Sequence, residues 1–133
     1  MIVVDTNLIA YLLLEGERTA QAEKVLLADG EWAAPSLWRS EFRNVLAVYL
    51  HREAISLDVA LKIAEEAEFL MEGKEYEISS SEVLNLVTES HCSAYDCEFI
   101  ALAQSFRVPL VTSDKRILSE FPKTAVSLES FVS

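Results

Sequence analysis

Short apolar segments alternate along this chain with longer segments that carry helical periodicity. Strands are predicted at 2–5 (IVVD), 32–34 (WAA), 76–79 (YEIS, the weakest), 109–112 (PLVT) and 125–128 (AVSL). Helices are predicted at 7–14, 18–29, 36–53, 57–71, 80–90, 94–107 and 115–120. Short apolar strands alternating with helices are typical of a parallel sheet that helices cover on both sides. We therefore predict an α/β fold with three layers, α/β/α, around a central parallel sheet.

The bulk composition is that of an ordinary globular domain. The chain has 133 residues, of which 51% are hydrophobic and 25% are charged. No apolar run approaches the ~18–20 residues of a membrane span, and no basic, cleavable leader precedes the first strand. We therefore expect a single domain over residues 1–133, located in the cytoplasm and not in a membrane.

The chain is strongly acidic, with a net charge of −11. This charge argues against broad electrostatic binding of nucleic acid. It does not argue against an enzyme that acts on nucleic acid through a metal ion and a small basic patch.

Familiar cofactor and zinc motifs are missing. None of the three glycines belongs to a phosphate-binding loop, which excludes the Rossmann and P-loop interpretations. Cys92 and Cys97 lie beside His91, but a fourth zinc ligand is missing, and His51 falls in a distant helix. We expect two packed thiols rather than a zinc site.

Two predicted strands end in an aspartate. Asp5 ends the first strand and Asp114 comes two residues after "PLVT", so both belong at the carboxyl edge of the sheet, where such folds bind ligands. Each aspartate could instead cap the helix that follows. Thr6 or Asn7 could cap the first helix in place of Asp5, and Ser113 could cap the later one.

A third acid, Asp96, lies in the first turn of the sixth predicted helix. With Ser93 as the N-cap, Asp96 takes the third helical position, an arrangement that is typical of a capping box. A carboxylate there is also held at a helix N-terminus, where negative charge is favoured. Glu98 points about 200° away around the helix and is predicted to lie on the surface.

The fourth acid, Glu41, falls on an apolar helix face. At about 100° per residue, Leu37, Val45 and Val48 lie on the same side of the helix. A buried carboxylate needs a partner, yet Arg52 lies about 16 Å along the axis. Either a cation from another segment pairs with Glu41, or Glu41 binds a metal.

Together the four acids have no matching set of cations directed at the core. Clustered carboxylates repel one another unless a positive charge lies among them. A hard divalent cation such as Mg²⁺ or Mn²⁺ prefers oxygen ligands and can promote phosphodiester hydrolysis. Neither histidine has an evident nucleophile or acid partner, so no catalytic triad competes.

The segments IVVDTNLIAYLL, WRSEFRNVL, SAYDCEFIALAQ and LVTSDKRIL resemble, in order and spacing, the motifs of PIN-domain ribonucleases. The whole chain looks most like the compact VapC-type toxins of toxin–antitoxin pairs. The resemblance implies a sheet of about five parallel strands and a metal-dependent endoribonuclease that cuts single-stranded or loop RNA. It also implies a homodimer and an antitoxin partner.

The resemblance assigns roles to individual residues. It implies that the metal-binding and catalytic acids are Asp5, Glu41, Asp96 and Asp114. The supporting polar residues would be Thr6 or Asn7, together with Ser113.

Few basic residues lie near the predicted site. Lys115 and Arg116 directly follow Asp114 and are the best candidates for RNA phosphate contacts. Arg39 and Arg43 each lie about 160° away from Glu41 around the helix, so we expect them to point elsewhere.

Two other functional classes remain open. A haloacid-dehalogenase-type phosphatase would need a second aspartate two residues after the first, where this chain has Asn7. A receiver domain would need paired acids early in the chain. A non-catalytic PIN-like module that binds RNA or protein would usually lack one of the four acids.

Overall fold

The computed structural model describes all residues, 1–133, and its centre is a five-stranded sheet. All strand pairs are parallel, and the strand order is β3-β2-β1-β4-β5. The strands are β1 (Ile2–Val4), β2 (Trp32–Pro35), β3 (Glu75–Tyr76), β4 (Leu110–Val111) and β5 (Ala125–Val126). The predicted parallel sheet is confirmed.

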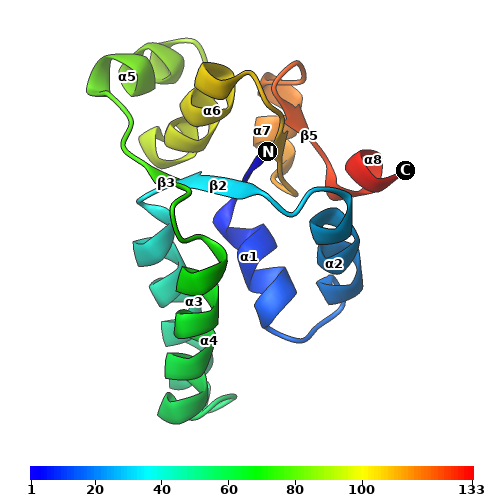
Figure 1. Ribbon diagram of the computed structural model, residues 1–133. Coiled ribbons are helices and arrows are strands. Elements are labelled where there is room, and N and C mark those ends of the chain that lie inside the picture. The colour runs from blue at the N-terminus through cyan, green and yellow to red at the C-terminus, as the bar shows by residue number, and fades with distance from the viewer.

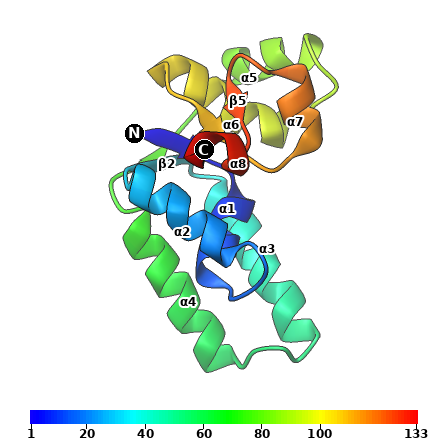
Figure 2. The ribbon, with the colours of Figure 1, turned by 90° about the vertical axis from the view of Figure 1, so that its right-hand side faces the viewer.

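Eight helices cover the two faces of the sheet. They are α1 (Thr6–Leu13), α2 (Thr19–Ala28), α3 (Trp38–His51), α4 (Leu57–Leu70), α5 (Ser80–Thr88), α6 (Ala94–Phe106), α7 (Lys115–Glu120) and α8 (Leu128–Val132). Helices α1 to α4 lie on one side of the sheet, and α5, α6 and α7 lie on the other (Figure 1). The view turned by 90° shows the same division, so the three-layer prediction is also confirmed (Figure 2).

The last segment differs from the prediction. The strand predicted at 125–128 ends at Val126, because Ser127 caps a further helix, α8, by accepting a hydrogen bond from the Ser130 N–H. The five-residue α8 is too short to show a helical period in the sequence. The weak strand predicted at 76–79 begins one residue earlier and is shorter, at Glu75–Tyr76.

The central strand β1 is buried on both faces. Val3 and Val4 are fully buried, and Val3 pairs with Ala33 of β2 and with Leu110 of β4. Helix α6 packs across β1, β2 and β4, while α1 packs against α2, α3 and α4 on the other side. Cys92 and Cys97 are free, buried thiols, as predicted.

The chain crosses to the opposite side of β1 between β3 and β4. The neighbours of β1 are therefore β2, which follows it in sequence, and β4, which comes much later. In open parallel sheets such a reversal leaves a crevice at the carboxyl ends of the two strands. Both strand-end aspartates follow strands that border this crevice.

Among the eight helices, none combines the length and the apolar character that a membrane span requires.

The short strand β3 is anchored to α3 by a bidentate ion pair. Arg39 donates to Glu75 from Nε at 2.6 Å and from Nη2 at 2.9 Å, and Trp38 Nε1 donates to Glu75 at 2.7 Å. Arg39 therefore faces away from the carboxyl-edge crevice, as predicted from its helical position.

We expect Arg39→Ala to lower the free energy of unfolding by roughly 1–2 kcal/mol, because it leaves the partly buried Glu75 carboxylate with one neutral donor. Urea unfolding measures this change. Arg43→Ala is the matched control, since Arg43 is exposed on the same helix and forms no salt bridge. Equal unfolding midpoints for the two variants would contradict the anchoring role.

Candidate active site

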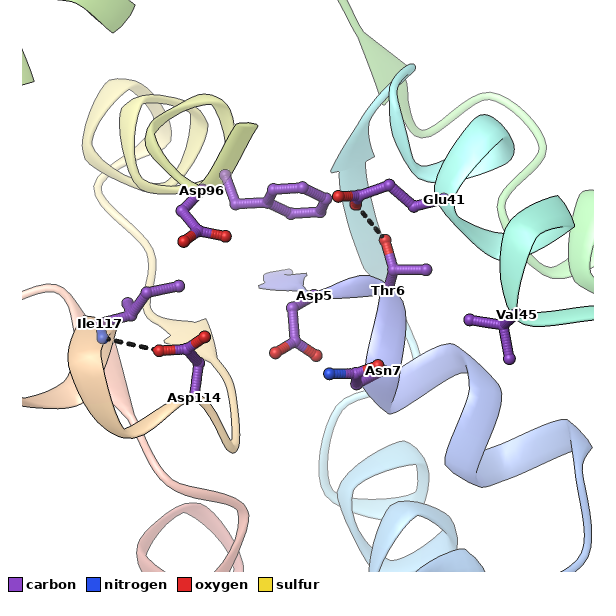
Figure 3. Close-up of a pocket in the computed structure, with 9 residues that line it drawn as sticks. Asp5, Thr6, Asn7, Glu41, Val45, Asp96, Asp114 and Ile117 are labelled. Carbon is purple, nitrogen blue, oxygen red and sulfur yellow. Dashed lines mark hydrogen bonds between the residues drawn. The ribbon is translucent and has the colours of Figure 1, made fainter. Parts of the chain in front are cut away.

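The four predicted acids surround one cavity at the carboxyl edge of the sheet. Its volume is about 130 Å³, and Figure 3 shows the carboxylates reaching it from four separate parts of the chain. The lining residues are Asp5, Thr6, Asn7, Glu41, Val45, Asp96, Phe99, Asp114 and Ile117. The convergence that the sequence implied is therefore present in the fold.

Asp5 has two structural partners, one for each carboxylate oxygen. Its Oδ1 accepts from the Leu8 N–H at 2.9 Å, so Asp5 is the N-cap of α1. The alternative that Thr6 or Asn7 caps the helix in place of Asp5 was wrong, because both residues lie inside the helix. Oδ2 accepts a short hydrogen bond from Thr112 Oγ1.

Thr112 is a member of the site that the sequence reasoning did not assign. It is fully buried at the end of β4, and its Oγ1 also accepts from the Asp114 N–H at 3.0 Å. One hydroxyl thus joins the two strand-end aspartates. The signal in the sequence was a polar residue that ends an apolar strand two positions before a candidate ligand.

The other two aspartates lie at helix N-termini. Asp114 caps α7, since its Oδ1 accepts from the Ile117 N–H at 3.0 Å. Asp96 lies in the first turn of α6, and its N–H donates to Ser93 Oγ at 3.1 Å, which confirms Ser93 as the cap. Capping and cavity lining are therefore combined in Asp5 and in Asp114 rather than being alternatives.

Glu41 is half-buried, and its partner is a hydroxyl. Thr6 Oγ1 donates to Glu41 Oε1 at 2.7 Å, as the dashed line in Figure 3 shows. None of the salt bridges in the structure involves Glu41, so the alternative of a cation partner was wrong. The predicted apolar face is only partly covered, because Val48 is 38% exposed.

The remaining predicted residues contribute unequally. Asn7 lines the cavity beside Asp5 (Figure 3). Ser113 does not line it and instead bonds to the Tyr11 hydroxyl at 3.0 Å. Lys115 and Arg116 are exposed and lie outside the lining, and Arg116 Nη1 donates to the His91 carbonyl oxygen at 3.1 Å.

A fifth acid lies close to this set. Glu98 was predicted to lie on the surface, but it is half-buried. Burial raises the pKa of Glu98, and the charges of Glu77 and Glu41 raise it further.

The site holds negative charge that the protein itself does not neutralise. Burial raises the pKa of Asp5 to about 6, against the opposing effect of its hydrogen bond from Thr112. Burial also raises the pKa of Glu41 and of Asp96; the Asp96 charge adds to the first shift and the Asp114 charge to the second. The charge of Arg116 opposes part of the shift of Asp96. Raised pKa values are the expected result of clustering carboxylates that no cation pairs with.

The donor chemistry fits a hard divalent cation. The lining offers carboxylate oxygens, with one hydroxyl and one amide, and no thiol or imidazole. Mg²⁺ and Mn²⁺ prefer such ligands. No three of the acids converge closely enough to ligate one ion as they stand, so the carboxylates surround the cavity rather than meeting at a point.

Comparison with known proteins identifies the family to which the chain belongs. The family model described as "PIN domain" matches residues 2–124. The chain therefore belongs to the PIN domain family. Ribonuclease VapC3 of Pyrobaculum aerophilum is 31% identical over 126 residues, which cover 91% of this chain and 95% of that protein.

Solved structures share the fold at lower identity. PAE2754 from Pyrobaculum aerophilum superposes with a TM-score of 0.73 at 22% identity, covering 98% of this chain and 92% of that one. A toxin–antitoxin complex from Klebsiella pneumoniae gives 0.70 at 20%, covering 96% and 98%. FitAcB from Neisseria gonorrhoeae gives 0.68 at 17%, covering 96% of each chain.

The raised pKa of Asp5 predicts how stability depends on pH. A carboxyl whose folded pKa, about 6, exceeds its ordinary value of 3.8 binds more protons in the folded state between those values. In metal-free buffer we therefore expect the free energy of unfolding to fall as the pH rises from about 4 through 6, by at most about 3 kcal/mol from this group. Urea unfolding in EDTA measures this.

Asp5→Asn should flatten this dependence, because the asparagine does not titrate. Asp58→Asn is the matched control, since Asp58 is exposed and makes the same change in net charge. A pH dependence that is equal in Asp5→Asn and in the wild type would contradict the assignment.

Proposed function

We propose that this protein is a metal-dependent endoribonuclease that hydrolyses phosphodiester bonds in single-stranded or loop RNA. The observation that carries the proposal is the cavity lined by Asp5, Glu41, Asp96 and Asp114, whose charges no lysine or arginine pairs with. The 31% identity to a ribonuclease supports RNA as the substrate.

The four acids would hold Mg²⁺ or Mn²⁺. A bound cation of this kind supplies Lewis-acid activation of the phosphodiester and of the attacking water. The protein contributes rigidity, because Leu8 N–H and Thr112 Oγ1 fix both oxygens of Asp5 and Thr6 orients Glu41. Asn7, at the rim beside Asp5, offers an amide that can orient water or a phosphate oxygen.

RNA would approach over the exposed start of α7. Lys115 has no acidic partner there, and Arg116 is held by the His91 carbonyl with its charge unpaired. We propose these two side chains as phosphate contacts. The net charge of −11 disfavours broad electrostatic binding of RNA over the rest of the chain.

We also propose that the protein is the toxin of a toxin–antitoxin pair, acting in the cytoplasm as a single domain over residues 1–133. One structural neighbour is a toxin–antitoxin complex. Helix α4 exposes Leu57, Leu61 and Phe69, apolar side chains that a protein partner could cover. The partners would be an antitoxin and a second copy of the chain in a homodimer.

The decisive experiment is RNA cleavage by purified protein in Mg²⁺ or Mn²⁺. We expect EDTA to stop cleavage. Asp5→Asn changes a proposed metal ligand itself, so it should lower the cleavage rate by more than the ~10–100-fold that is typical of changing a residue that only hydrogen-bonds to a ligand. Asp58→Asn should cleave normally. Cleavage that survives both EDTA and Asp5→Asn would indicate a contaminant, and no cleavage by the wild type would favour a non-catalytic binding module.

Asp96→Asn and Asp114→Asn separate the catalytic role from the structural one. Asparagine caps helices as well as aspartate does, so the α7 cap should persist while the charge is lost. We expect cleavage to be abolished, with the melting temperature in EDTA unchanged or slightly higher. A melting temperature lowered by many degrees would show that the charge itself serves the fold.

A further inference from the structure

Glu120, the last residue of helix α7, forms hydrogen bonds to the turn that leads into α6. The Glu120 carboxylate accepts from the His91 backbone N–H at 2.9 and 3.2 Å, and His91 Nδ1 lies 3.0 Å from Oε1. Cys92 Sγ donates to the same carboxylate at 3.7 Å. Burial raises the pKa of Cys92 to about 11, so the thiol remains a donor at neutral pH. We call this set of contacts the Glu120 clamp.

A second contact comes from the first turn of α7, where Arg116 Nη1 donates to the His91 carbonyl oxygen. Together with the Glu120 clamp, it accounts for every hydrogen bond between residues 88–98 and residues 113–121. Beside the apolar packing of Ile117 and Cys97 in the core, these few polar contacts around one turn are the hydrogen bonds that join the two segments.

Each segment carries one of the site acids. Helix α7 begins directly after its cap, Asp114, and the clamped turn ends at Ser93, the cap of the helix that carries Asp96. The two carboxylates face the same cavity. Burial raises the pKa of Asp96, and the like charge of Asp114 raises it further, because the two carboxylates repel each other. Without a cation between them, the repulsion between the two acids tends to move their segments apart. The Glu120 clamp and the hydrogen bond from Arg116 oppose this movement.

We propose that Glu120 is a positioning residue that sets the separation of Asp96 and Asp114 for binding a divalent cation. The inference rests on the metal-dependent function proposed above. Glu120 itself does not line the cavity, so it acts only through the turn and through α7. Removing a partner that orients metal ligands typically costs ~10–100-fold in metal affinity.

The test is Mn²⁺ binding by isothermal titration calorimetry of the wild type and of Glu120→Ala. We expect the Kd of the variant to be about 10-fold weaker. The Mn²⁺ concentration for half-maximal RNA cleavage should rise by a similar factor, while cleavage at saturating Mn²⁺ stays close to the wild-type rate. A role limited to folding would not produce this split between affinity and maximal rate.

Two further variants sharpen the comparison. Glu89→Ala makes the same change in charge two residues before the turn, where the exposed side chain forms no hydrogen bond, so it should bind Mn²⁺ normally. His91→Ala removes the ring contact but keeps the backbone N–H, and it should weaken binding less than Glu120→Ala does. If Glu120→Ala does not fold, Glu120→Gln keeps the shape with one acceptor and should weaken binding to an intermediate degree.

The outcomes distinguish a failure of the proposed role of Glu120 from a failure of the proposed metal site. If wild type and Glu120→Ala bind Mn²⁺ equally, Glu120 has no positioning role. A lower melting temperature in EDTA with unchanged Mn²⁺ affinity would assign Glu120 to the fold alone, which also overturns the proposal. A wild type that binds no Mn²⁺ would overturn the metal site itself, and that result is visible before any variant is compared.

Discussion

The site depends on one buried hydroxyl at the end of β4. Thr112 donates to Asp5 and accepts from the Asp114 N–H, so it ties the carboxyl ends of two strands whose residues are more than a hundred positions apart. Each aspartate also has one oxygen occupied by a helix N–H. The backbone thus fixes where the carboxylates stand, while their charge is left uncompensated. In this fold, the strand ends that run into an acid are the places where a carboxylate reaches the cavity.

Much of the fold follows from the pattern of the sequence. Apolar strands such as IVV and WAA have no polar face, which requires helices on both sides and hence a parallel sheet. The strand order is not contained in that pattern, because β1 is flanked by β2 and by the distant β4. Helix α8 was missed since five residues cannot display a helical period, although Ser127 supplied a cap signal.

The sequence predicted the acids of the candidate site, but not the residues that hydrogen-bond to them. Placing Asp5 and Asp114 at one sheet edge requires only that the strands be parallel. The hydrogen bond from Thr6 to Glu41 and the burial of Glu98 depend on how α1, α3 and α6 pack, and no spacing within one helix reveals this. The sequence left open which of Asp5, Thr6 and Asn7 caps α1, because all three are good caps by type. Asp5 is the cap because β1 ends at Val4 and the helix begins at Thr6.

Because the partner of Glu41 is a hydroxyl, the carboxylate keeps its negative charge and the cavity stays open. A lysine or arginine would neutralise the carboxylate permanently and fill part of a cavity of about 130 Å³. Thr6 instead orients one oxygen at 2.7 Å and adds no charge. The cost is visible in the raised pKa values of Asp5, Glu41 and Asp96, which mark carboxylates that are destabilised when ionised. A cation bound in the proposed way would relieve that same destabilisation, so the electrostatic repulsion in the metal-free site would contribute to metal affinity.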